Sequence, residues 1–293
     1  MQQTPESRLA YLGFQRITPS RLLRPYVQSY WFFRRENPLR DSYQEYMHPR
    51  GGFGIIFNAG DPLYLDAKAV PEPIFLDGAN TVSRKVGFQG HVELIGIRFY
   101  EGGAYPFLGM PLDEFRNETS LPDALAGPAL LRLYEHLLEA QSNTTRISLL
   151  EEWLAGRLVP GKARNLLVPA SLKMLRESQG RLSIPDLARE LAISQRQLDR
   201  LYQSQVGISP KQYAQLLRID TARLALKKMN GPSEPSLARL AADLGFYDQS
   251  HFIREFSAVI GITPYAYLKH NRSIVGRFSI PGGCQESRPT GLW

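Results

Sequence analysis

The chain has 293 residues, 43% hydrophobic and 22% charged, which is the composition of an ordinary globular protein long enough for two domains. Its one cysteine, Cys284, excludes an internal disulfide and a cysteine cluster for zinc. The first residues lack the apolar stretch of an export signal, and no run approaches membrane-spanning length. We therefore expect a cytoplasmic protein that does not contact a membrane.

The positive charge is unevenly distributed along the chain. Residues 1–170 contain 18 Lys/Arg and 18 Asp/Glu, a net charge of zero. Residues 171–293 contain 17 Lys/Arg and 10 Asp/Glu, so the whole formal charge of +7 lies in this part. A basic excess in one region suggests a polyanionic partner, most often nucleic acid, although charge alone also fits a solvated basic surface.

The first part of the chain is predicted to be mainly β-structure. From 26 to 100, segments such as "YVQSYWFFRRE" and "VELIGIRFY" are rich in aromatic and β-branched residues and are separated by Gly/Pro turns. Several short strands without intervening helices predict an antiparallel barrel or sandwich. Leucines at helical spacing over 122–158 then predict two helices, an antiparallel pair joined near "QSNTT". We place this first domain at residues 1–160.

The remaining chain is predicted to be helical. "VPGKARN" (159–165) predicts a linker, and residues 166–271 predict an all-α domain. Residues 276–293 contain too few apolar side chains to fold alone and predict a flexible tail. The expected fold class is α+β with two domains.

An internal repeat organises the second domain. "AISQRQLDRLYQSQVGISPKQY" (192–213) aligns with a stretch 54 positions later, which pairs Arg200 with Arg254. In the preceding helix the offset is 53, as in Leu187 with Leu240. We expect the one-residue difference in a turn, because inside a helix it would rotate every later side chain by about 100°.

Each copy predicts a helix-turn-helix unit, the first over 183–206 and the second over 236–260. In each unit the second helix has a polar outer face, although a single pair of amphipathic helices would more often have no role in DNA binding. A helix over 210–229, about 30 Å long, connects the units. Since successive major grooves on one face of B-DNA lie about 34 Å apart, the two units are spaced to enter both, with DNA bending to absorb the mismatch.

The paired units, the connecting helix and the ending "GFYDQSHFIREFSAVIGITPYAYL" closely resemble the DNA-binding domain of AraC/XylS-type bacterial transcription regulators, over about residues 166–271. The N-terminal region resembles a cupin-like sensor domain often fused to it, in "HPRGGFGIIFNAGDP" (48–62), "LDGANT" (76–81) and "ELIGIRFYEGGAYPFLGMPLDEF" (93–115). It departs from that pattern at Glu101, where the resemblance implies proline. The resemblance implies a regulator that reads DNA with its C-terminal domain and senses a signal or dimerises through its N-terminal domain.

Side chains in the first turns of a recognition helix reach the edges of DNA bases. In the two units these are Gln195, Arg196, Asp199 and Arg200, and Gln249, Ser250 and Arg254. Arg pairs with guanine, Gln with adenine, and Asp accepts from cytosine. Asp199 has an alternative role, a salt bridge that positions one of the neighbouring arginines.

Contacts to DNA phosphates are expected at the helix N-termini and from basic side chains near them. The N-cap candidates Ser194 and Asp248 precede free backbone amides, and Lys211 and Arg218 lie on the connecting helix. His251 follows Asp248 and is predicted to pack or to contact phosphate.

Polar residues at the mouth of the predicted barrel are candidates for holding a small-molecule effector. They are Tyr30, His48, Arg50 and Arg98. The five histidines form no metal-binding motif, so we expect neither a metal nor a cofactor.

Three classes of function were compared. The sequence favours a transcription regulator with no catalytic residues, whose partners are double-stranded DNA, a small-molecule effector, a second copy in a homodimer, and RNA polymerase if it activates. A cupin-like small-molecule enzyme with a DNA-localising helical module is the alternative. A helical module that binds only protein is the third possibility, which the salt dependence of DNA binding distinguishes.

Overall fold

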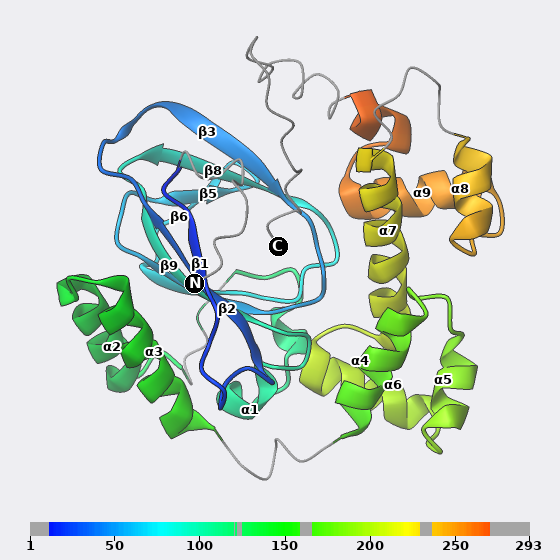
Figure 1. Ribbon diagram of the computed structural model, residues 1–293, viewed down its shortest axis with the longest axis horizontal. Coiled ribbons are helices and arrows are strands. Elements are labelled where there is room, and N and C mark those ends of the chain that lie inside the picture. The colour runs from blue at the N-terminus through cyan, green and yellow to red at the C-terminus, as the bar shows by residue number, and fades with distance from the viewer. Residues whose placement is uncertain (1–11, 120, 122–124, 159–165, 229–235, 270–293) are drawn as a thin grey trace.

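The computed structural model describes residues 12–119, 121, 125–158, 166–228 and 236–269. Antiparallel sheets form the N-terminal part and helices the C-terminal part, and the two parts lie side by side (Figure 1). The α+β fold class is therefore confirmed. The predicted linker, the predicted tail and Cys284 lie outside the described residues, and the predicted domain boundaries stay predictions.

Two antiparallel sheets make up the N-terminal part. The first has the order β1 (Gln15–Ile17), β2 (Val27–Arg34), β9 (Glu93–Phe99), β4 (Gly54–Asn58) and β7 (Ile74–Asp77). The second has the order β3 (Leu39–Met47), β8 (Arg84–Gly90), β5 (Leu63–Leu65) and β6 (Lys68–Val70). The cupin-like assignment itself stays a prediction.

Successive side chains of β2 alternate between two apolar clusters, which explains how the first sheet is buried on both faces. Trp31 and Phe33 belong to an apolar cluster with the second sheet, whereas Tyr30 and Phe32 belong to the larger core shared with the helices. Successive side chains of a strand point to opposite faces, so one run of aromatic residues supplies both cores. Trp31 lies opposite Gly96 on β9, where an added Cβ would lie 1.9 Å from the indole ring.

Two helices follow the strands as predicted, and two short helices that were not predicted precede them. The pair joined near "QSNTT" is α2 (Pro128–Glu139) and α3 (Asn143–Arg157), and Ser142 caps α3 by accepting from the backbone N–H of Thr145. The sequence analysis missed α1 (Tyr105–Leu108) and the 3-10 helix η2 (Asp113–Phe115). Both are too short to show a helical period.

The C-terminal part consists of helices arranged around α7 (Pro210–Lys228), the predicted connector. Figure 1 shows α4, α5 and α6 at one end of α7 and α8 and α9 at the other. Their bounds are α4 (Leu167–Glu177), α5 (Ile184–Glu190), α6 (Gln195–Val206), α8 (Leu237–Asp243) and α9 (Gln249–Ile260). Among the described residues, none of the helices combines the length and apolar character needed to cross a membrane.

The one-residue difference between the repeats lies in a turn, as predicted. The C-cap residues of α5 and α8 are Leu191 and Leu244, and each is followed by a left-handed residue, Ala192 or Gly245. One residue then precedes the N-cap Ser194 in the first unit, and two precede Asp248 in the second. The extra residue is Tyr247, whose side chain is 93% exposed.

Candidate nucleic-acid interface

The second helix of each helix-turn-helix unit, α6 or α9, is the candidate reading helix, and each begins at a residue whose side chain caps it. The Oγ of Ser194 accepts from the backbone N–H of Gln197 at 3.2 Å, and Oδ1 of Asp248 accepts from that of His251 at 2.6 Å. Each cap satisfies one of the free amides of the first turn. The remaining amides and the positive end of the helix dipole suit an anion such as a DNA phosphate.

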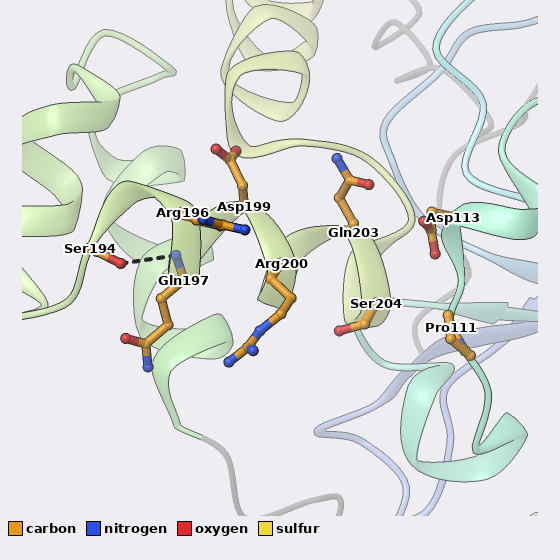
Figure 2. A pocket seen from close by; sticks show the side chains of 9 residues that line it. All are labelled: Pro111, Asp113, Ser194, Arg196, Gln197, Asp199, Arg200, Gln203 and Ser204. Carbon is orange, nitrogen blue, oxygen red and sulfur yellow. Dashed lines mark hydrogen bonds between the residues drawn. The ribbon is translucent and has the colours of Figure 1, made fainter.

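The outer face of α6 brings three of the four predicted base-contacting residues into one groove, and Gln195 does not line it. Leu198, Tyr202 and Val206 are buried against the domain, which leaves Gln195, Arg196 and Arg200 exposed and Asp199 half-buried. Four of the predicted residues (Ser194, Arg196, Asp199 and Arg200) line a groove of about 660 Å³ along the helix (Figure 2).

The groove contains side chains that the sequence analysis did not choose. Gln197 and Gln203 line it, and Gln203 follows Arg196 by seven positions, so helical periodicity could have identified it. In Figure 2, Asp199 and Gln203 project to one side of α6 and Arg200 to the other. Within the described residues, no ion pair joins Asp199 to either arginine.

The second reading helix, α9, also has one buried face and one exposed face. Phe252 and Phe256 are fully buried, whereas Gln249, Ser250 and Arg254 are exposed. Ile253 is half-buried between them. The second unit therefore presents fewer charged groups than the first, although the two helices begin and end at equivalent positions of the repeat.

The three basic side chains predicted to contact phosphate lie in different surroundings. Lys211 is exposed in the first turn of α7. Arg218 and His251 share Glu255, with Arg218 Nη2 at 3.4 Å from Oε2 and His251 Nε2 at 3.1 Å from Oε1. The Arg218 guanidinium also lies over the ring of Phe246. Lys211 is thus freely available to a phosphate, whereas Arg218 and His251 must share their donors with protein groups.

Within the part of the chain that the structure describes, the four predicted effector-binding residues lie in different surroundings. Tyr30 is fully buried, and Arg98 is a buried ion-pair partner of Asp77, at 3.7 Å between Nη1 and Oδ2. Burial raises the pKa of the Asp77 carboxyl and lowers that of Arg98, because both charged forms lose hydration. His48, Arg50 and Arg98 border a space of only about 10 Å³.

His48 lies where the two parts of the chain meet. Its Nδ1 is 2.9 Å from the Oγ of Ser83, and its ring contacts that of Tyr267 edge-on. Burial lowers the pKa of His48 to about 3, and the nearby Arg223 guanidinium contributes. His48 therefore connects the strands to the segment that follows α9.

The N-terminal part contacts the last turns of both reading helices. The backbone N–H of Leu112 donates to the carbonyl of Ser204 on α6 at 2.9 Å, and that of Ser83 donates to Val259 on α9 at 2.7 Å. Both bonds satisfy carbonyls that a helix C-terminus otherwise leaves free. Next to the first contact, Pro111 and Asp113 border the groove that contains Arg200.

Comparison with known proteins agrees with this arrangement in the C-terminal part. Residues 187–270 match a family described as a helix-turn-helix domain, and residues 15–120 match a domain of unknown function, DUF6597. YidL, an uncharacterised HTH-type transcriptional regulator of Escherichia coli, is 36% identical over 92 residues, which are 31% of this chain and 30% of YidL. A Streptomyces lividans protein described as an AraC-like transcription regulator is 30% identical over 119 residues, 40% of this chain and 36% of its own.

Among solved structures, a Chromobacterium violaceum transcriptional regulator with an AraC-type DNA-binding domain is 25% identical. The match covers 38% of this chain and 91% of the other, with a TM-score of 0.31. The chain spans between 30% and 56% of the length of the first curated relatives that it matches.

Proposed function

We propose that this chain, whose C-terminal part belongs to the AraC-type helix-turn-helix family, is a sequence-specific DNA-binding transcription regulator. The observation that carries the proposal is the presence of two capped helices with polar outer faces, α6 and α9, at the two ends of α7. In each helix the predicted base-contacting side chains are exposed or half-buried.

The length of α7 supports contact with two successive major grooves. It has 19 residues, and at 1.5 Å per residue it is about 28 Å long. The groove repeat on one face of B-DNA is about 34 Å. We infer that α6 and α9 enter neighbouring grooves and that the DNA bends toward the protein to absorb the difference.

The N-terminal part is proposed to receive a signal or to dimerise, and we assign it no reaction. Support for the sensing role comes from its contacts with both helix-turn-helix units, since a change in either contact would reach a reading helix directly. A small-molecule effector, a second copy of the chain and, for an activator, RNA polymerase are the proposed partners besides DNA. We propose that the protein acts in the cytoplasm.

Selection from a randomised duplex library with the full chain tests the proposed function. We expect one enriched sequence with two elements about one helical turn apart, because the two units are joined by a single helix. Binding should weaken steeply with salt. Six or more phosphate contacts would give a slope of log K against log salt of about −5 or steeper. Binding that does not depend on salt, with no enriched sequence, would indicate a protein-binding module instead.

A further inference from the structure

A cavity of about 840 Å³ lies between the N-terminal part and the helical part. Its N-terminal wall contains Tyr26, Arg50 and Glu101, and its C-terminal wall is formed by α4 and α7. This volume falls in the range of small-molecule sites. The cavity adjoins Arg50 but is separate from the narrow space beside Arg98.

Two ion pairs join the walls of the cavity. In one the N-terminal part supplies the cation, and in the other it supplies the anion. Arg50 Nη2 lies 3.5 Å from Oδ2 of Asp220 on α7, and Glu101 Oε2 lies 3.3 Å from Nη1 of Arg176 on α4. Each wall therefore supplies one cation and one anion. Both distances exceed the roughly 2.7–2.9 Å of a tight charge-assisted hydrogen bond.

The guanidinium of Arg50 has a donor that no protein group uses among the described residues. Its partner Asp220 is held more closely by Arg223, with Nη2 at 2.6 Å and Nε at 3.0 Å from Oδ1. The Nε of Arg50 is buried and has no hydrogen-bond partner among the described residues. A carboxylate in the cavity could accept from Arg50, and Asp220 would keep its pair with Arg223.

Glu101 can exchange its partner in the same way. Its side chain is 16% exposed, whereas that of Arg176 is 46% exposed and can return to water. The Nη1 of Arg176 also donates to the Tyr213 hydroxyl at 3.4 Å. An ammonium group could therefore pair with the carboxylate of Glu101 in place of Arg176, because the Arg176 guanidinium can be hydrated when it is displaced.

The rest of the wall suits an apolar body with a few polar groups. Val168, Leu172 and Leu216 are buried side chains that line the helical side. Gln28 also lines the cavity and lies at the register shift in β2, where the pairing with β9 skips a residue. Such irregularities redirect side chains and are common beside binding sites.

We propose that this interdomain cavity binds a small zwitterion with an apolar body, its carboxylate on Arg50 and its ammonium on Glu101. The ligand would replace both cross-domain ion pairs, and so alter how the N-terminal part holds α4 and α7. The proposal rests on the proposed regulatory function only for what this change does to DNA binding. Ligand binding itself is measured without DNA, so the two proposals can fail separately.

Calorimetric titration of the full chain with four matched probes tests the proposal. They are L-phenylalanine, 3-phenylpropionate without the ammonium, 2-phenylethylamine without the carboxylate, and uncharged N-acetyl-L-phenylalaninamide. We expect L-phenylalanine to bind at least about tenfold more tightly than each of the others, since each lacks a charge-assisted hydrogen bond. Binding of no probe up to about 10 mM, or equal binding of 3-phenylpropionate and L-phenylalanine, overturns the proposal.

Two variants locate the binding site. Arg50→Gln and Glu101→Gln should each weaken L-phenylalanine binding by about tenfold or more, because each removes one charged partner. The matched control is Arg132→Gln, an exposed arginine on α2 outside the cavity. Thermal melts of all three variants verify folding. If a folded Arg50→Gln and a folded Glu101→Gln both bind as the control does, the ligand is elsewhere and the proposal is wrong.

Discussion

At the scale of single residues, Arg196 and Lys211 separate base reading from phosphate binding. Arg196 lies in the groove along α6, and Lys211 is exposed at the start of α7. We expect Arg196→Ala to relax sequence preference at one or two base pairs, at a cost of about 1–3 kcal/mol on the preferred site. Lys211→Ala should weaken all sequences about equally and make the salt slope shallower by about one.

Binding of both variants to a randomised-site library measures this difference. Arg254→Ala serves as the comparison in the second unit, where α9 presents fewer charged groups, and should cost less specificity than Arg196→Ala. If Arg196→Ala lowers the affinity for every sequence alike, α6 is not the principal reader.

A second prediction at this scale concerns acid and His48. Burial lowers the pKa of His48 to about 3, whereas the unfolded chain takes up a proton near pH 6.5. Below pH 6.5 the unfolded state therefore binds more protons, so stability is lost as pH falls from about 6.5 toward 3. Between pH 7 and 5 this one group costs at most about 2 kcal/mol.

His48→Asn should remove that part of the acid sensitivity. Urea unfolding at pH 7 and pH 5 measures the loss in the wild type and in the variant, which share all other titratable groups. Arg50, Arg223 and Lys227 also disfavour the charged imidazole, whereas Asp220 favours it. Equal losses in the two proteins would show that His48 becomes protonated as readily in the folded chain as in the unfolded one.

At the scale of elements, the repeat made the helical part predictable. The offsets of 54 and 53 required a one-residue difference in a turn, and Tyr247 lies there, before the cap of α9. The strands were predicted from their aromatic and β-branched runs, but α1 and η2 were not, because their conformation depends on tertiary contacts. One such contact is the bond from Leu112 to Ser204.

Gly207 and Gly261 offer a matched pair of helix ends. Both follow a reading helix with a positive φ, of 88° and 87°. Alanine at either position should cost about 1–2 kcal/mol from left-handed strain. At Gly207 the added Cβ would also lie 2.9 Å from the carbonyl oxygen of Leu112, whereas at Gly261 no atom lies within 4 Å among the described residues.

We therefore expect Gly207→Ala to lower the free energy of unfolding more than Gly261→Ala, because it also displaces the N-terminal part from α6. Chemical denaturation of the two variants provides the comparison. Equal losses would mean that the contact between Leu112 and α6 adds nothing to stability.

At the scale of the whole molecule, the docking of the two parts was not predictable from the sequence. Periodicity identifies which face of a helix is buried, but not which loop of another domain covers its end. Tyr30, His48, Arg50 and Arg98 were grouped because polar residues were expected at the mouth of a barrel, and their role in effector binding stays a prediction. In the structure His48 contacts Tyr267 and Arg50 pairs with Asp220 across the two parts, which the sequence could not show.

The docked N-terminal part places a carboxylate beside the reading surface. Asp113 borders the same groove as Arg200, where negatively charged DNA is proposed to bind. Asp113→Asn should therefore tighten DNA binding of the full chain severalfold at low salt, with the gain shrinking as salt screens the repulsion. Asp41→Asn, an exposed carboxylate on β3, is the control. Equal affinities for wild type and Asp113→Asn would place Asp113 away from the bound DNA.

Hydroxyl-radical footprinting of the full chain on its selected duplex tests the central claim most directly. If α6 and α9 enter successive major grooves, the cleavage pattern should contain two protected patches on one face of the DNA, about 10 base pairs apart. Arg200→Ala should weaken one patch and Arg254→Ala the other, since the two arginines hold equivalent places in the repeat. A single protected patch that responds to only one of these substitutions would contradict reading by both units.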